Sequence, residues 1–329
     1  MKKLLPLLII LSVRCQLLYN QTVVPQGRPI AEIFTDFHYI VNDTSQRTGF
    51  DLNRAHLGYN FKPDGNFSST IIVNLGSPVD LATGSKPRRY AYFREASILY
   101  SKNNLNLFFG LVSTRIFDFQ QKFWGKRYLN PEFQSLYGYG SVADLGVVVD
   151  YKISDIVKVD LSLLNGEGYT NIQIDNSIKS AFGITISLPC RLYFRQYADF
   201  LRSEGVWQAT LITFAGIKRE IVSFGAEASF KSNIDLTEGH NVWGISATGS
   251  LFPDKKYEIF TRIDYSASVH LTGEELQWDY KLDGVYLISG VQRNFTDNIK
   301  LSLNYRGVFP YNPEKDITSA IFLNALFRF

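Results

Sequence analysis

Few residues of this chain have the types and spacing that catalysis or metal binding requires. The four histidines are His38, His56, His240 and His270, and no pair of them has the spacing of a metal-ligand motif. Gly-x-Ser-x-Gly, Walker and His-Glu-x-x-His patterns are absent. His38 and Asp36 would share one face of a strand and are the pair that could serve a hydrolase. Polar residues on one face of a strand are more simply explained by contact with water. We therefore expect no enzyme activity, no metal and no cofactor.

Most of the chain shows the period-two pattern of β-strands. Between residues 222 and 230, for example, Val, Phe and Ala alternate with Ser, Gly and Glu. Phe, Trp and Tyr make up 15% of the residues, which favours strands. About sixteen strands are expected, at 30–41, 49–61, 67–75, 90–101, 104–112, 142–151, 156–165, 179–188, 191–198, 206–217, 219–230, 242–252, 257–269, 284–295, 299–308 and 317–329. Alternation leaves the two faces of 206–217 and 284–295 undecided.

The connections between these strands alternate between short and long. The short ones are 62–66, 102–103, 154–155, 189–190, 218, 253–256 and 296–297; the intervening ones, mostly longer, are 76–89, 113–141, 166–178, 199–205, 231–241, 270–283 and 309–316. Barrels of the bacterial outer membrane have short periplasmic turns and longer extracellular loops, with strands of about 9–11 residues. The sequence therefore predicts an all-β fold, a transmembrane antiparallel β-barrel of about 16 strands in the bacterial outer membrane.

The N-terminus has the pattern of a secretory signal peptide. Lys2 and Lys3 precede a short apolar run that is too short to span a bilayer. We assign residues 1–20 to this segment, with an uncertain cleavage site, and 21–329 to a single barrel domain. Losing Lys2, Lys3 and Arg14 lowers the formal net charge from +3 to 0, so no basic nucleic-acid-binding signature remains. Cys190 would then be the only cysteine, and Arg14 directly before Cys15 argues against lipidation.

The C-terminal segment 317–329 alternates apolar and polar residues and ends on an aromatic one. This pattern is similar to the assembly signal of outer-membrane barrels, which we assign to Phe327 and Phe329. A soluble sandwich could also end on such an edge strand. The alternation of short and long connections favours the barrel.

One face of each strand would line a wet lumen in such a barrel. The charged and polar residues that we expect to line it are Arg54, His56, Glu95, Asp144, Lys158, Glu227, Arg262, Asp264, Lys300 and Arg306. Both signs of charge occur among them, so such a lumen would show only a modest preference between ions. Many of these charges are expected to pair with one another across the strands.

The connection 113–141 is the longest and is rich in aromatic residues. Connections beyond about 12–15 residues are usually functional or disordered, and this composition argues against disorder. We expect the segment to fold into the lumen and to form a constriction with a net positive field, which predicts a mild preference for anions. The residues assigned to the constriction are Arg115, Lys122, Trp124, Lys126 and Arg127. The alternative is an external lid or a surface that docks a partner.

Four short runs carry a resemblance to a known family: NRAHLGYNF from Asn53, FWGKR from Phe123, ADLG from Ala143 and NGEGY from Asn165. Together, in this order, they resemble a Bacteroidota-type outer-membrane porin, related in pattern to the phosphate-selective porins O and P. The resemblance implies a sixteen-stranded, water-filled pore for passive diffusion of small hydrophilic solutes, and a homotrimer. His56 stands where the family pattern has Arg, so anion selectivity is not carried over.

The partners expected for such a barrel are the lipid bilayer, lipopolysaccharide, the barrel-assembly machinery and other outer-membrane proteins. No nucleic acid is expected among them. The alternative function is a non-conducting accessory subunit of a larger outer-membrane complex.

Overall fold

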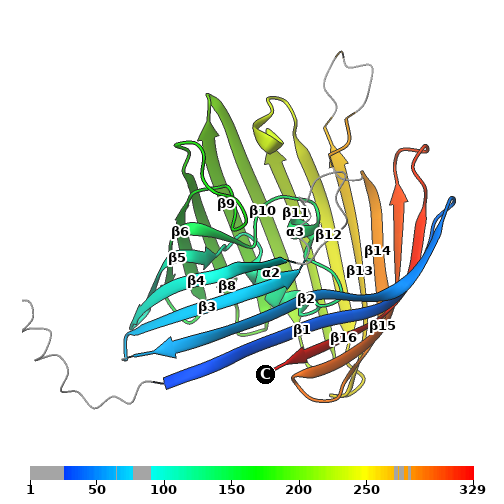
Figure 1. Ribbon diagram of the computed structural model, residues 1–329, viewed down its shortest axis with the longest axis horizontal. Helices are drawn as coiled ribbons and strands as arrows, with labels where there is room; N and C mark the ends of the chain where they lie inside the picture. Colours follow the sequence, from blue (N-terminus) through cyan, green and yellow to red (C-terminus); the bar gives the residue numbers. More distant parts are fainter. Residues whose placement is uncertain (1–25, 64, 77–89, 270–272, 274–277, 281–282) are drawn as a thin grey trace, which may run out of the picture.

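The strands of this protein close into a single antiparallel barrel. The computed structural model describes residues 26–63, 65–76, 90–269, 273, 278–280 and 283–329, so the expected signal peptide lies outside the described residues. Within those ranges sixteen strands follow one another around the ring, and β16 pairs back with β1 (Figure 1). The predicted fold class is confirmed. In the same ranges no helix is long and apolar enough to cross a membrane.

The strand bounds follow the alternating segments of the sequence. They are β1 (Gln26–Val41), β2 (Gln46–Lys62), β3 (Phe67–Gly76), β4 (Tyr90–Lys102), β5 (Leu105–Ser113), β6 (Ala143–Lys152), β7 (Val157–Leu164), β8 (Lys179–Ser187), β9 (Leu192–Ser203), β10 (Val206–Lys218), β11 (Val222–Ser232), β12 (Val242–Leu251), β13 (Tyr257–Ser268), β14 (Gly284–Asn294), β15 (Ile299–Pro310) and β16 (Thr318–Arg328). A short 3-10 turn, η2 (Ile234–Leu236), lies between β11 and β12.

The expected loop 199–205 is wrong. The alternation of β9 continues through Asp199, Phe200 and Leu201 to Ser203, so only Glu204 and Gly205 connect β9 to β10. Both residues have positive φ, 50° and 90°, as a tight two-residue hairpin requires. The barrel wall is therefore extended at this point where a long extracellular loop was expected.

The two faces of the wall differ as a membrane barrel requires. Outward side chains are large and apolar, and Phe109, Leu161 and Trp207 remain more than half exposed on this outer surface. Inward side chains such as Ser246, Asp264 and Asn324 are polar and are buried inside the ring. A closed sheet satisfies its own backbone hydrogen bonds, which permits strands to cross a bilayer.

The segment between β5 and β6, residues 114–142, lies inside the ring; we call it the inner loop. It contains the short helices α2 (Asp118–Trp124) and α3 (Phe133–Leu136). Figure 1 shows both helices within the circle of strands. The main apolar core of the molecule is formed where this loop packs against the inner wall.

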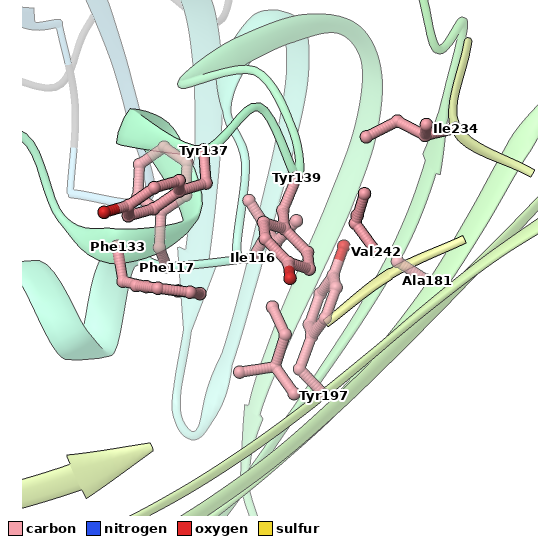
Figure 2. Packing of buried hydrophobic residues seen from close by; sticks show 10 residues of the cluster. Ile116, Phe117, Phe133, Tyr137, Tyr139, Ala181, Tyr197, Ile234 and Val242 are labelled. Carbon is pink, nitrogen blue, oxygen red and sulfur yellow. The ribbon is translucent and has the colours of Figure 1, made fainter. Parts of the chain in front are cut away.

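One half of that core joins the inner loop to strands β8 to β12. Figure 2 shows Tyr139 of the loop beside Tyr197 of β9 and Val242 of β12, and Phe133 beside Phe117 and Tyr137. Phe133 and Tyr139 have no exposed surface. Burial of an aromatic side chain of this size contributes about 1.5–3 kcal/mol, so these contacts hold the loop against the wall.

The other half of the core lies across the lumen, against β13 to β16 and β1. Trp124 packs edge-on against Phe260 of β13, with the ring centroids 5.9 Å apart, and Tyr128 contacts Phe34 of β1 at 6.3 Å. The inner loop therefore lies along the wall from β8 around to β1.

The strands whose faces the sequence left undecided are those that receive the inner loop. Ile212 and Phe214 of β10 and Tyr286 and Ile288 of β14 point inward although they are apolar. Phe214 contacts Phe123 at 4.9 Å between ring centroids. Both faces of these strands are apolar because one meets lipid and the other meets the loop, which removes the alternation.

Candidate functional site

Buried polar contacts fix the inner loop to the wall, and three of the residues expected to line the pore make them. Arg262 donates to the carbonyl oxygen of Pro131 at 2.6 Å and forms two hydrogen bonds with Asp264, at 2.8 and 2.6 Å. Gln134 donates to Glu227 at 2.7 Å. Arg262 and Asp264 are almost completely buried. In this structure Glu227, Arg262 and Asp264 hold the loop.

Two further residues expected to line the pore are also held by the protein. Asp144 is buried and accepts hydrogen bonds from the backbone N–H groups of Leu145 and Gly166, at 2.8 and 2.9 Å. It thereby fixes the start of the connection after β7. Arg306 donates to Asn304 and Asn324, both at 2.9 Å, and its guanidinium lies 3.6 Å from the ring centroid of Phe322.

The residues assigned to the constriction do not produce the free positive charge expected of them. Each of the four cations has a carboxylate partner: Arg115 with Asp150, Lys122 with Asp118, Lys126 with Glu258, and Arg127 with Glu132. Trp124 is 6% exposed and packs into the core. These four cations are therefore each neutralised by a neighbouring carboxylate.

Two β-bulges, one on β2 and one on β4, bring further arginines to the lumen. The β1–β2 register shifts between Phe34 and Thr35, which makes Asn53 an extra residue, and the β3–β4 register shifts between Ile72 and Val73, which makes Arg94 extra. A bulge lets neighbouring residues break the strict alternation of a strand. The guanidinium of Arg54 lies 5.4 Å from the ring centroid of Phe34, whose side chain points inward. The adjacent Asn53 also binds an inward residue, because its amide donates to Asp36 at 2.6 Å.

The same bulge on β4 brings two adjacent charges to the lumen. Arg94 donates to the hydroxyl of Ser113 at 3.1 Å, and Glu95 accepts from the same hydroxyl at 3.2 Å and from Ser97 at 2.9 Å. Sequence reasoning included Glu95 and missed Arg94. Two consecutive charged residues between outward Phe93 and Ala96 were the available signal of a bulge.

Arg54, Arg94 and Arg127 form the arginine group of the lumen. They lie close enough to repel one another electrostatically, and each is partly exposed. Arg127 is paired with Glu132. Arg54 and Arg94 make no ion pair with any residue that the structure describes. His56, the next inward residue on β2, lies 3.4 Å from Glu32, which also binds Arg328.

Two cavities lie between the inner loop and the strand ends that meet the short turns. Lys158 faces a cavity of about 560 Å³ next to α2, where Arg195 and Asp160 are paired at 2.7 Å. Lys300 faces a second cavity of about 190 Å³, together with Lys218 and Glu258. Sequence reasoning missed Lys218 and Glu258 because both lie next to short turns, where alternation gives little information.

The C-terminal aromatic residues lie on the outer surface at the closure of the barrel. Phe327 and Phe329 are 42% and 73% exposed. The backbone N–H of Phe329 donates to the carbonyl of Ala31 at 3.0 Å, and Ala31 donates back at 2.9 Å. The last residue thus joins the final strand to the first. Its role as an assembly signal stays a prediction.

His38 and Asp36 are in contact, at 2.8 Å, but form a buried pair. The second oxygen of Asp36 accepts from Asn53, and no serine hydroxyl is a partner of His38 among the described residues. In the same part of the chain no three or more His, Cys, Asp or Glu side chains are grouped as a metal site would need.

Comparison with known proteins shows the fold alone. No family model matches the chain, and no curated protein matches it. Three similar solved structures are the outer membrane channel DcaP of Acinetobacter baumannii (13% identity, TM-score 0.63, 94% of this chain and 99% of that one), OmpF of Salmonella typhi in complex with daunomycin (10%, 0.67, 92% and 97%), and the trimer form of OmpT of Vibrio cholerae (11%, 0.60, 93% and 100%). This chain has the fold of a bacterial outer-membrane barrel.

Proposed function

We propose that this protein is an outer-membrane porin, a water-filled channel for passive diffusion of small hydrophilic solutes, constricted by the inner loop. The observation that carries the proposal is the packing of this loop inside a closed barrel whose inner wall is polar. The loop is held along β8 to β1, by the core of Phe133 and by the Arg262–Pro131 hydrogen bond. Among the described residues, the two apolar clusters of the loop include none from β2 to β5, so solutes would pass on that side.

The arginine group supports a mild preference for anions. Arg54 and Arg94 project from that same wall, and Arg127 faces them from the loop. Glu95 lies beside Arg94 and Glu132 pairs with Arg127, so three positive charges stand against two negative ones. Uncompensated charge in a narrow, low-dielectric passage raises the local concentration of the opposite ion. The proposed constriction therefore includes Arg54 and Arg94 besides the residues of the loop.

The test is conductance of the purified full-length barrel in a planar bilayer. We expect stepwise openings and a reversal potential in a KCl gradient that favours chloride. Deleting Phe119 to Phe133 should raise the single-channel conductance and lower the anion preference. Unchanged values on both counts would place the loop outside the conducting path.

A non-conducting accessory subunit is the second candidate, and the density of the internal core favours it. Loop side chains as large as Phe133 and Tyr139 are completely buried in the lumen, which narrows the remaining space. This function predicts a stable partner that co-purifies with the barrel and no conductance in the bilayer assay. Conductance without a partner would exclude it.

The remaining assignments belong to the same proposal. Residues 1–20 act as a signal peptide, 21–329 form the barrel domain, and the protein assembles as a homotrimer, as the trimer form of OmpT suggests. Its partners are lipopolysaccharide, the assembly machinery and other outer-membrane proteins. Kinship with Bacteroidota-type porins like the phosphate-selective porins O and P also stays a proposal. The buried His38–Asp36 pair supports a protein without enzymatic activity.

A further inference from the structure

A third, much smaller cavity lies between the inner loop and the wall at β11 and β12. Gln120 and Glu132 of the loop line it, together with Glu227 of β11 and Ser246 of β12. Its volume is about 10 Å³, at the lower limit of what one water molecule needs. The cavity is therefore too small for a solute and has room for a single water molecule or a single small ion.

Three oxygen atoms of this lining have no hydrogen-bond partner among the described residues. They are Oε1 of Gln120, Oε1 of Glu132 and Oγ of Ser246. Each of these residues is at most 3% exposed. A buried polar atom without a partner costs about 1–3 kcal/mol, and such atoms are rare in folded proteins. Their grouping around one cavity indicates that a ligand satisfies them.

The carboxylates around this cavity outnumber the cations. Glu132 is paired with Arg127, and Asp264 with Arg262. The guanidinium of Arg262 also borders the cavity, but Asp264 binds it through two hydrogen bonds. Glu227 accepts a hydrogen bond from a neutral amide at 2.7 Å and forms no ion pair with any residue that the structure describes. Three carboxylates thus face two guanidinium groups, which leaves one negative charge uncompensated.

We propose that this cavity binds one sodium ion, which joins the inner loop to β11 and β12. Carboxylate, amide and hydroxyl oxygens are the ligands that hard cations prefer. A monovalent cation neutralises the charge of Glu227, whereas a divalent one would overcompensate it. Potassium is disfavoured because it is larger than sodium and the cavity is small.

A water molecule or a proton would satisfy this cavity less completely. A water molecule could accept from Nε1 of Trp124, which also lines the cavity without a partner among the described residues, but it carries no charge for Glu227. A proton on Glu227 removes the charge and supplies one donor for three unpaired oxygen atoms. A sodium ion meets both demands at once, since it coordinates several oxygens and supplies one positive charge.

This site has a different composition from the metal sites that the sequence motifs represent. Those motifs consist of His, Cys and carboxylate ligands at fixed spacing. Here each ligand comes from a separate segment, Gln120 from α2, Glu132 from the residue before α3, and Glu227 and Ser246 from two strands. No motif therefore marks the site. Binding goes beyond the proposed porin function, because it requires only that the inner loop is docked.

The test is equilibrium dialysis of radioactive sodium against the full barrel in detergent, with choline chloride holding the ionic strength constant. We expect saturable binding of one sodium ion per barrel and weaker competition by potassium than by unlabelled sodium. Sodium chloride should also raise the unfolding temperature relative to the same concentration of choline chloride. Glu227→Gln should weaken sodium binding about tenfold, which corresponds to about 1.4 kcal/mol, and should abolish that rise.

A second variant and a control separate binding from folding. Gln120→Leu removes one ligand oxygen without a change of charge and should also weaken sodium binding. Glu238→Gln is the matched control, because Glu238 is exposed in the connection after β11 and does not line the cavity. Heat-modifiable migration would show that each variant is folded.

Two results would overturn the site. One is the absence of saturable sodium binding, which would assign the cavity to water or to a protonated Glu227. The other is equal sodium binding by the unaltered barrel and by Glu227→Gln. A barrel that conducts without binding sodium contradicts this inference alone, and one that binds sodium without conducting contradicts the porin function alone.

Discussion

At the scale of residues, Arg54 and Arg94 set the expected ion preference. Replacing Arg54 or Arg94 with Ala should lower the chloride-to-potassium permeability ratio about tenfold each, because a unit charge roughly 6 Å from an ion in water is worth about 0.7 kcal/mol, which favours chloride and disfavours potassium. Reversal potentials in a KCl gradient measure this ratio. Arg202→Ala is the control, since that arginine stacks on Trp207 at 5.1 Å on the outer wall. A ratio unaffected by both inward replacements would remove these arginines from the passage.

Lys126 gives the ion preference a dependence on pH. Burial lowers the pKa of Lys126 to about 8, and Glu258 opposes that shift while Lys218 and Lys300 add to it. The side chain is therefore charged at pH 7 and mostly neutral at pH 9. Over this interval the chloride-to-potassium permeability ratio should fall about fourfold, because a unit charge roughly 10 Å from an ion in water is worth about 0.4 kcal/mol, which favours chloride and disfavours potassium.

The variant Lys126→Met isolates this group. It keeps the length of the side chain and removes the titration, so its permeability ratio should be flat between pH 7 and pH 9. An equal fall in the variant would assign the pH dependence to another group.

Alternation predicted which residues point inward but could not predict how they pair. Glu227 and Arg262 bind Gln134 and Pro131 of the loop between β5 and β6, which is far away in sequence, and Asp264 binds Arg262. Arg94 was missed, because a bulge shifts the alternation of β4 and its signal in the sequence was the adjacent pair of charged residues Arg94 and Glu95.

At the scale of elements, the inner loop is held by its aromatic residues. Phe133→Ala should destabilise loop docking by about 3–5 kcal/mol, the usual cost of emptying a fully buried aromatic site. We expect a lower unfolding temperature and noisier single-channel currents. Phe93→Ala is the matched control, because that side chain is 56% exposed on the outer wall of β4. Equal effects of the two replacements would mean that the loop is not held by this core.

The wall is shaped to receive these rings. A Cβ atom at Gly216 of β10 would come within 2.7 Å of Cζ of Phe123, and one at Gly244 of β12 would collide with Phe133. The aromatic content of the loop predicted its burial from the sequence. Only the lost alternation of β10 and β14 indicated which side of the lumen the loop covers. The same loss occurs in any strand that is apolar on both faces for other reasons.

At the scale of the whole molecule, the last residue closes the ring. Phe329→Asp places a charge beside the pairing of β16 with β1 and should strongly reduce the amount of heat-modifiable protein in the outer-membrane fraction. Tyr311→Asp is the control, since Tyr311 is 74% exposed in the connection before β16. Normal amounts of folded Phe329→Asp protein would show that this residue is dispensable for assembly.

The barrel itself was predictable because alternation and connection length are properties of the local sequence. The short turns expected at 154–155 and 218 lie at 153–156 and 219–221, and the long connection after β5 is present as expected. The length of the β9–β10 connection was not predictable, because Asp199 and Arg202 have residue types common in loops and yet continue the alternation of a strand.

The contacts of the inner loop also order the steps of folding. Tyr128 packs against Phe34 in the first strand, and the same cluster includes Leu326 in the last, so the full docking surface exists only after the ends of the chain have met. Contacts between residues so distant in sequence form late. We expect the ring to close around water first and the loop to dock afterwards. Each newly inserted barrel would then leak solutes briefly, until its own aromatic residues seal most of the lumen.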